Sequence, residues 1–329
     1  MISFIATVYN EGENIHRLMQ SLARQTRLAD EIVIVDGGSC DDTVALLHGY
    51  TTTLPLVVLV ENGANISRGR NLAFEHTHGD VIAISDAGVT LPDDWLERLI
   101  APLEADASVQ VACGFFRADP HTVFEVAMGA TVLPLASEIT PATFLPSSRS
   151  VAVRRGAFER VGGYPEWLDY CEDLIFDLRL KQVGTFVFVP EACVWFRPRG
   201  TLASFYKQYY LYARGDGKAD LWRKRHAIRY LTYVLGAPIL LGLALGHHPL
   251  WWGIILVASG FYLRTPYQRL PHVMRSFAQR EPVSVMDWAL ALLWIPLIRV
   301  VGDVAKMIGY PVGWAWRLRH SPPRWQVLP

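Results

Sequence analysis

The first 36 residues, MISFIATVYNEGENIHRLMQSLARQTRLADEIVIVD, decide the fold of the chain. Two short apolar runs, residues 2–8 and 31–36, enclose a helix-like segment at about residues 12–25. A strand, a helix and a second strand in this order predict a βαβ unit with parallel strands. The alternation continues, with further strands predicted at 55–60 and 80–84.

This alternation predicts an α/β domain built on a mostly parallel sheet with helices on both faces. The later helices are predicted at about 41–49, 66–77 and 92–103. In such sheets ligands bind beyond the carboxyl ends of the strands. The polar residues at these ends are Thr7, Asn10 and Glu11, then Asp36, then Asp86. Several carboxylates directed toward one rim indicate a site for a charged, hydroxyl-rich ligand.

The composition is that of a folded protein whose two halves differ in charge. The chain is 51% apolar, 19% charged and formally neutral, which excludes a disordered protein. Residues 1–197 carry 14 Lys and Arg against 26 Asp and Glu, whereas residues 198–329 carry 17 against 5. A net charge of −12 joined to one of +12 indicates two different kinds of structure in one chain.

The four cysteines are widely spaced and argue against a zinc site or a disulfide framework. They are Cys40, Cys113, Cys171 and Cys193. The N-terminal segment has no basic region and no long apolar region, so a cleaved signal peptide is not expected. Both features favour a cytoplasmic location for the acidic half.

The basic half contains a run of 34 residues, 230–263, without Asp, Glu, Lys or Arg. One helix of this length would extend roughly 51 Å, well beyond the ~30 Å hydrocarbon core of a bilayer. The segment His247-His248-Pro249 interrupts the run, because proline disfavours helix in the residue before it. The sequence predicts a helical membrane hairpin with arms at about 230–246 and 249–263. The alternative is a buried hairpin of a soluble protein.

A third apolar stretch runs from about residue 285 to 316, with Arg299, Asp303 and Lys306 on one helical face. This stripe suits an interfacial helix, which we prefer, or a third span. Basic residues flank the hairpin on both sides and none lies in its turn. The positive-inside rule then predicts an inner-membrane protein with its acidic half in the cytoplasm. The predicted domains are residues 1–217, and residues 218–329 with the juxtamembrane and membrane-embedded helices.

Five motifs in the first 217 residues resemble, in order, those of the family 2 glycosyltransferases. They are Thr7-Val8-Tyr9-Asn10-Glu11, Val35-Asp36-Gly37-Gly38-Ser39, Gly69-Arg70-Asn71, the run from Gly79 to Asp86, and Gly162-Gly163-Tyr164 with Glu172-Asp173. The stretch from Gln208 to Gly217 further resembles exopolysaccharide enzymes of the succinoglycan type. The resemblance implies a GT-A fold and inverting sugar transfer from a nucleotide-sugar donor, expected to be a UDP-sugar. The implied acceptor is a lipid-linked saccharide or polysaccharide at the cytoplasmic membrane face.

The resemblance assigns the donor site to the strand ends. Asp36 would accept hydrogen bonds from uracil or ribose, and Thr7, Tyr9 and Glu11 would line the same pocket. Arg70 would approach the base or the phosphates.

Asp86 is the expected metal ligand and a further donor-binding residue. The family usually has Asp-x-Asp at this point, and the second carboxylate commonly binds the Mg²⁺ or Mn²⁺ that bridges the donor diphosphate. This chain has Asp86-Ala87-Gly88 instead. One carboxylate with phosphate and water ligands is expected to hold such an ion more weakly.

Asp173 is the expected catalytic base, with Glu172 as the second candidate. An inverting transfer needs a carboxylate that removes the proton of the acceptor hydroxyl. Asp169 and Glu172 are also spaced as the N-cap and N3 residues of a capping box, which gives Glu172 a structural alternative. The resemblance places Gln208 and Arg214 near the diphosphate and the acceptor.

The aromatic and basic segment around residues 205–225 is expected to meet anionic membrane lipids rather than nucleic acid. Two other functions stay open on the sequence alone. Gly88 is compatible with a non-catalytic relative that acts as an assembly subunit. A nucleotidyltransferase would share the βαβ start, but it gives no reason for the Glu172-Asp173 pair or the hairpin.

Overall fold

The computed structural model describes residues 1–328, which form two compact units. The first unit contains residues 1–117, 136–196 and the C-terminal residues from 323, and it holds the sheet. The second contains residues 118–135 and 197–322 and is helical. Residues 197–217, which the predicted boundary groups with the sheet, fold with the helical unit.

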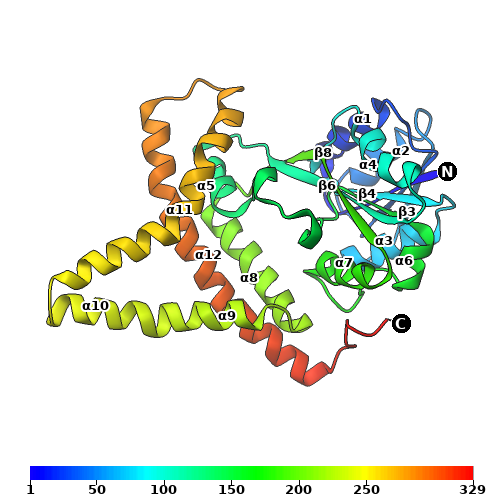
Figure 1. Cartoon of the computed structure of the whole chain (residues 1–329). Helices are drawn as coiled ribbons and strands as arrows, with labels where there is room; N and C mark the ends of the chain where they lie inside the picture. The colour runs from blue at the N-terminus through cyan, green and yellow to red at the C-terminus, as the bar shows by residue number, and fades with distance from the viewer. Residues whose placement is uncertain (329) are drawn as a thin grey trace. The chain divides into compact units, whose positions relative to one another are not determined.

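The first unit is built on an eight-stranded sheet with the order β3-β2-β1-β4-β7-β6-β8-β5 (Figure 1). The strands are β1 (Ile2–Val8), β2 (Glu31–Asp36), β3 (Leu56–Val60), β4 (Val81–Ile84), β5 (Val89–Thr90), β6 (Val109–Ala118), β7 (Val151–Arg154) and β8 (Thr185–Phe196). Strands β1 to β4 pair in parallel, as the alternation predicts. Strand β7 runs antiparallel to β4 and β6, and β5 runs antiparallel to β8. This antiparallel half was not predicted.

Helices cover both faces of the sheet, as predicted (Figure 1). One face carries α1 (Ile15–Ala23), α2 (Thr43–His48) and α4 (Trp95–Ala105), and the other carries α3 (Ile66–Glu75), α6 (Arg155–Arg160) and α7 (Glu172–Val183). Short 3₁₀ turns lie at Gly12–Asn14, Ala136–Glu138 and Pro141–Thr143. Because successive side chains of a strand point to opposite faces, Phe4 and Ile5 of β1 belong to different hydrophobic cores.

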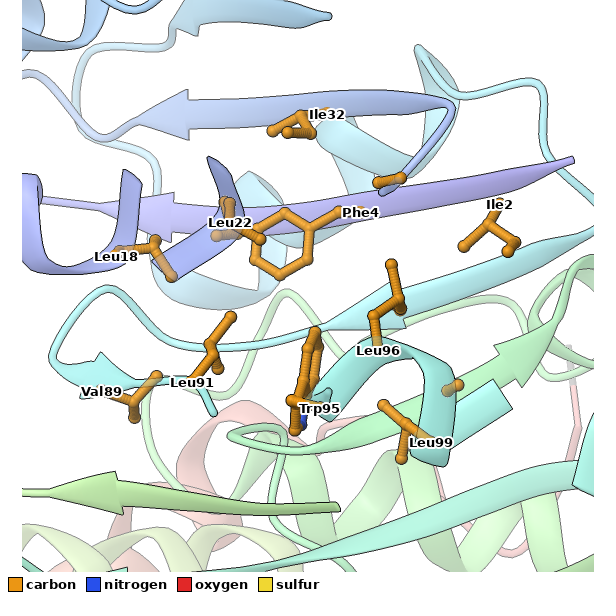
Figure 2. Close-up of a cluster of buried hydrophobic side chains, with 14 of the residues drawn as sticks. Ile2, Phe4, Leu18, Leu22, Ile32, Val89, Leu91, Trp95, Leu96 and Leu99 are labelled. Carbon is orange, nitrogen blue, oxygen red and sulfur yellow. The ribbon is translucent and has the colours of Figure 1, made fainter. Parts of the chain in front are cut away.

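Figure 2 shows the first of these cores, with Phe4 between α1 and α4. The rings of Phe4 and Trp95 meet edge to face with centroids 6.1 Å apart. Leu18 and Leu22 of α1 pack on the same cluster. A central strand that is buried on both faces reads as a continuous apolar run, which is why residues 2–8 predicted it correctly.

The second unit consists of six α-helices and a π-helical segment among the described residues. The helices are α5 (Val123–Val132), α8 (Leu202–Ala219), α9 (Arg223–Tyr230), α10 (Ala237–Gly246), α11 (Leu250–Ala278) and α12 (Val285–His320), and the π segment is Leu231–Gly236. Their shared core includes Val126, Phe205, Leu270 and Ile295. Each of these four residues comes from a different helix, so the core joins α5, α8, α11 and α12.

Helices α8 and α12 approach each other through glycines. A Cβ atom on Gly309 would lie 2.2 Å from the carbonyl oxygen of Tyr210, and one on Gly313 would lie 1.9 Å from that of Arg214. Both distances are far shorter than any real carbon–oxygen contact. Glycine at these positions of α12 therefore permits direct backbone contact with α8.

Two helical segments of the described chain are long and apolar enough to cross a membrane, by length and composition alone. They are Arg223–Gly246, which includes α9, the π segment and α10, and Val285–His320, which is α12. Only 6% and 22% of their apolar windows are buried. Core helices of soluble proteins pass the same test, but such helices are mostly buried.

The predicted hairpin turn is present, since α10 ends at Gly246 and α11 begins at Leu250. The first arm is longer than predicted, because helix extends back to Arg223 and reaches roughly 36 Å at 1.5 Å per residue. Helix α11 continues to Ala278 and does not pass the test. Composition therefore favours α12 over α11 as the second span, the reverse of the sequence-based preference.

Candidate active site

The strand order places a crevice at the carboxyl ends of β1 and β4. The chain leaves β1 toward β2 on one side, and β4 lies on the other side of β1. In open α/β sheets such a reversal of strand order is the point where ligands bind. Thr7 lies near the end of β1 and Asp86 follows β4, so the two lie on adjacent strand ends as predicted.

A pocket of about 200 Å³ opens at this point, between β1, β2 and the start of α3. Its lining includes Thr7, Tyr9, Glu11 and Gly69, and Tyr9 is 61% exposed. A Cβ on Gly69 would lie 2.5 Å from the Thr7 Cγ2 atom, so glycine lets α3 pack closely on β1. The volume is below the range of roughly 300–1,000 Å³ for whole small-molecule sites, which suits one ring-sized group.

Asp36 lies beneath this pocket rather than on its lining. It is fully buried, and one carboxylate oxygen accepts hydrogen bonds from the backbone N–H groups of Gly38 (2.8 Å) and Ser39 (2.7 Å). The other oxygen accepts from the Ser39 hydroxyl at 2.5 Å. Gly38 has a φ of +95°, a conformation that favours glycine. Asp36 thus organises the loop after β2, and its direct contact with a base or ribose stays a prediction.

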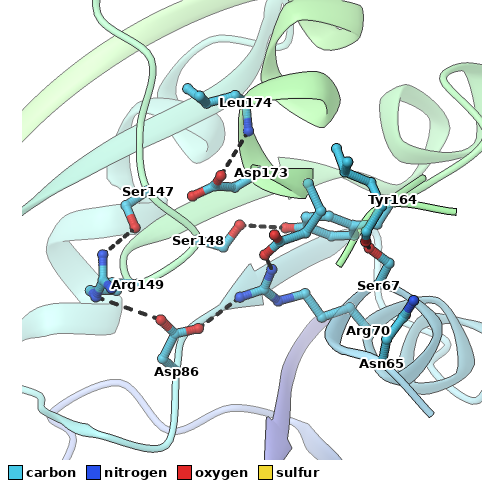
Figure 3. Close-up of polar contacts among 12 residues, drawn as sticks. Asn65, Ser67, Arg70, Asp86, Ser147, Ser148, Arg149, Tyr164, Asp173 and Leu174 are labelled. Atoms are coloured by element: carbon cyan, nitrogen blue, oxygen red, sulfur yellow. Dashed lines mark hydrogen bonds and ion pairs between the residues drawn. The ribbon is translucent and has the colours of Figure 1, made fainter. Parts of the chain in front are cut away.

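Arg70 is the centre of the polar network shown in Figure 3. Its guanidinium is only 2% exposed and donates to Asp86 at 2.7 Å and to Glu172 at 2.9 Å. The Tyr164 ring lies 4.9 Å from its central carbon. A buried cation needs such partners, because an unpaired charge in the interior is strongly destabilising. Arg70 therefore joins the expected donor side to the expected catalytic side, while its own contact with the donor stays a prediction.

Helix α7 begins at Glu172, which corrects the predicted capping box. Cys171 is the N-cap, with a φ of +66° and no side-chain cap hydrogen bond. Glu172 is therefore the first helical residue instead of the N3 residue after Asp169, and its carboxylate turns to Arg70. The prediction failed because the left-handed backbone of Cys171 and the distant arginine are not visible in the local sequence.

Both acids at the start of α7 have raised pKa values. Burial, with the nearby Asp173 charge next, raises the pKa of Glu172 to about 7, and Arg70 opposes this shift. Burial also raises the pKa of Asp173, against the charges of Arg70 and Arg149. The Asp173 carboxylate accepts a hydrogen bond from the backbone N–H of Leu174 at 2.8 Å. A carboxylate with a raised pKa beside a cation is a suitable general base.

The structure adds residues that the motifs do not mark. Arg149, which precedes β7, lies with its Nε atom 3.6 Å from Asp86 and donates to the Ser147 hydroxyl at 2.9 Å. Ser148 and Tyr164 share a hydrogen bond of 2.8 Å beneath the Arg70 network. The only signal in the sequence is an arginine among serines just before an apolar run, and that is too common to be specific.

The residues around Asp86 do not form a divalent-metal site by themselves. One carboxylate oxygen of Asp86 pairs with Arg70, and the other faces Arg149. Gly88 offers no side chain, and a Cβ placed there would meet nothing within 4 Å. No group of three or more His, Cys, Asp or Glu residues with metal-binding geometry occurs within residues 1–328. The residues present therefore do not fit the expected Mg²⁺ or Mn²⁺ as a protein-held cofactor.

Gln208 and Arg214 both lie on α8, in the helical unit. The Gln208 amide donates to the Tyr212 hydroxyl at 2.8 Å. Their expected role near the diphosphate and the acceptor stays a prediction.

The fold and the arginine-bridged acidic site agree with the comparisons to known proteins. A sequence model of the family described as "Glycosyl transferase family 2" matches residues 3–159. The class of protein is therefore a glycosyltransferase, as predicted. The chain belongs to family 2 through this N-terminal domain. This assignment favours neither a nucleotidyltransferase nor a non-catalytic subunit.

Two curated relatives span most of the chain. "Succinoglycan biosynthesis protein ExoA" of Rhizobium meliloti (strain 1021) is 29% identical over 250 residues, which cover 71% of this chain and 74% of the relative. "Glycosyltransferase AglE" of Haloferax volcanii is 27% identical over 256 residues, 73% of this chain and 80% of the relative. The predicted resemblance to succinoglycan-type enzymes is confirmed.

A solved structure supports the fold. "Mannosyltransferase PcManGT from Pyrobaculum calidifontis in complex with GDP-Man and Mn2+" aligns with a TM-score of 0.53 and 20% identity, over 97% of this chain and 87% of that chain. The predicted GT-A fold is confirmed by this likeness.

Proposed function

We propose that this protein transfers a sugar with inversion from a nucleotide-sugar donor, a UDP-sugar, to a lipid-linked saccharide or polysaccharide at the cytoplasmic face of the inner membrane. The observation that carries the proposal is the network in which Arg70 holds Asp86 and Glu172 together, with Asp173 next to Glu172. This network lies at the strand ends, beside a pocket of a size that suits a nucleobase.

The chemistry follows from the residues of the network. The acceptor hydroxyl attacks the anomeric carbon from the face opposite the leaving nucleoside diphosphate, and Asp173 accepts the hydroxyl proton. Arg70 fixes the positions of Asp86 and Glu172 without moving, because its guanidinium is fully enclosed. The products are the glycosylated acceptor with inverted configuration, the nucleoside diphosphate and a proton.

The donor base is assigned to the pocket lined by Thr7, Tyr9 and Glu11. Tyr9, exposed at the rim, offers an aromatic face for stacking. Asp36 supports this pocket from below through the loop that it organises.

The acceptor is assigned to the membrane because the helical unit exposes apolar surface. Leu235, Ile239 and Leu245 of the first hairpin arm are each more than half exposed. Basic residues at the start of this arm, Arg223 to Arg225, suit anionic lipid head groups. The name of the relative ExoA, a succinoglycan biosynthesis protein, supports a polysaccharide product.

A thermal-shift panel followed by a turnover assay tests this proposal. The full-length protein in detergent is screened against uridine and guanosine diphosphates and their sugar conjugates, with and without Mn²⁺. Stabilisation by one nucleotide class identifies the donor, and proton NMR of the product reports the anomeric configuration. Binding without turnover would support a non-catalytic assembly role, and retention of configuration would contradict the inverting mechanism.

A further inference from the structure

We propose that Arg149 is a donor-binding residue that holds the diphosphate of the nucleotide sugar. This inference rests on the proposed function, to which it adds a residue outside all the motifs. The ligand group is a nucleoside diphosphate, and the contact is an arginine fork on phosphate oxygens.

The backbone of Arg149 is fixed at the end of β4. Its carbonyl oxygen accepts a hydrogen bond from the hydroxyl of Ser85, the residue before Asp86, at 2.7 Å. The next residue, Ser150, is buried, donates to the carbonyl of Ala192 at 2.8 Å and accepts from the Trp95 indole at 2.8 Å. These contacts hold the Cα atom of Arg149 beside the crevice.

The side chain of Arg149 is held less tightly than that of Arg70. Its ion pair with Asp86 is long, at 3.6 Å, and the side chain is 24% exposed, against 2.7 Å and 2% for Arg70. The guanidinium lies over the rings of Phe196 (4.7 Å) and Phe116 (5.7 Å). A guanidinium supported on its face keeps its edge for bidentate contact with phosphate oxygens.

The position of Arg149 matches the path of the donor. The nucleoside is assigned to the pocket beside Gly69, and the sugar must reach Asp173 for transfer. The diphosphate joins these two groups, so it passes the Arg70–Asp86 pair, where Arg149 lies (Figure 3). Phosphates beside the Asp86 carboxylate need a cation for neutralisation, and the described residues form no metal site there.

Calorimetry on the full-length protein in detergent tests the inference. The probes are UDP, GDP, uridine and guanosine, each with and without Mg²⁺. Arg149→Met should weaken the nucleoside diphosphate about 10-fold to 100-fold, as expected for a lost charge-assisted contact. Affinity for the nucleoside alone should change less than about 2-fold, because no phosphate is present.

Arg155→Met is the matched control. Arg155 is also 24% exposed and stacks on Phe74 at 4.7 Å, but it donates to the carbonyl of Gly79, before β4 rather than after it. This variant should keep the parental affinity for the diphosphate. Arg149→Gln, which also lacks the charge, serves if Arg149→Met does not fold, as judged by its Tm.

The outcomes separate the two proposals. If the parent binds no diphosphate better than its nucleoside, the proposed function fails and this inference fails with it. If the parent prefers the diphosphate and the foldable Arg149 variant binds it with parental affinity, this inference alone is overturned. An equal loss for diphosphate and nucleoside would also overturn it, because a general disturbance of the pocket would explain both.

Discussion

The residue that connects the site is Arg70, an arginine with almost no exposed surface. It holds Asp86 after β4 and Glu172 at the start of α7, although the latter is 102 positions away in sequence. Substrate contacts are therefore left to groups around it: Asp173 on one side, and Arg149 and the pocket residues on the other. Two predictions at this scale concern Glu172 and Gly88.

Replacing Glu172 with glutamine should change how stability depends on pH. Since the pKa of Glu172 is raised to about 7 in the folded protein, the bound proton stabilises the fold below about pH 4.5, and this contribution is lost as pH rises through 7. Glutamine imitates the protonated form at every pH. The Tm of Glu172→Gln relative to the parent should therefore rise between pH 5 and pH 8, and a falling difference would show that Glu172 is ionised throughout.

Restoring a carboxylate at position 88 should create a metal requirement. The space around Gly88 is open, so Gly88→Asp places a second carboxylate near Asp86 without a clash. One or two carboxylates plus phosphates suffice for Mg²⁺. We expect nucleotide affinity to rise about 10-fold with Mg²⁺ in this variant, an increment of roughly 1.4 kcal/mol, and less in the parent. Gly88→Ala is the control, and identical Mg²⁺ responses in Gly88→Asp and Gly88→Ala would contradict the prediction.

At the scale of elements, the α8–α12 contact depends on backbone approach. Gly309 and Gly313 of α12 lie directly against carbonyl groups of α8. Even a methyl group at position 313 would force the two helices apart, since the nearest atom is backbone. The contact within the helical unit is therefore specified by two glycines four residues apart.

We expect Gly313→Ala to destabilise the protein by about 1–3 kcal/mol, the usual cost of overpacking. Gly242 in α10 is the matched control, because a Cβ there meets nothing within 4 Å. Gly242→Ala should be neutral or stabilising by up to about 1 kcal/mol through helix propensity. Thermal unfolding in detergent measures both variants. Equal Tm values for the two would show that α8 and α12 are not tightly packed in solution.

Elements with local signals were predicted well, and contacts between distant segments were not. The parallel strands follow from apolar runs that are buried on both faces, as in residues 2–8. The start of α7 was misplaced because the left-handed Cys171 has no sequence signature and Glu172 pairs with a residue far away. Arg149 was missed for the same reason, because Asp86, Phe116 and Phe196 meet it only through the fold.

For the whole molecule, the central physical feature is a folded, acidic unit joined to helices with exposed apolar surface. Leu245, Leu256 and Phe261 are each more than 70% exposed. In water such a surface is unfavourable by roughly 25 cal/mol per Å² of apolar area. A lipid environment around these helices removes that penalty.

The full chain should therefore remain with membranes after washing with 1 M salt (about 3 Å screening length) and after carbonate extraction, and detergent should release it. Release by salt alone would reduce the attachment to the basic residues around Arg223 and Arg225. Release by carbonate without detergent would make the association peripheral. Immunoblotting of pellet and supernatant distinguishes these outcomes.

The proposed mechanism makes Asp173 the general base, and the turnover of Asp173→Asn tests that claim most directly. Asparagine keeps the size of the side chain but cannot accept the proton. With the donor identified by the nucleotide panel, kcat should fall about 10²-fold to 10⁴-fold, or roughly 3–5 kcal/mol of transition-state stabilisation. The dissociation constant of the nucleotide should stay within about 2-fold, because the pocket residues lie elsewhere. Near-parental kcat in Asp173→Asn would contradict the account, and loss of turnover in Glu172→Gln alone would give the base role to Glu172.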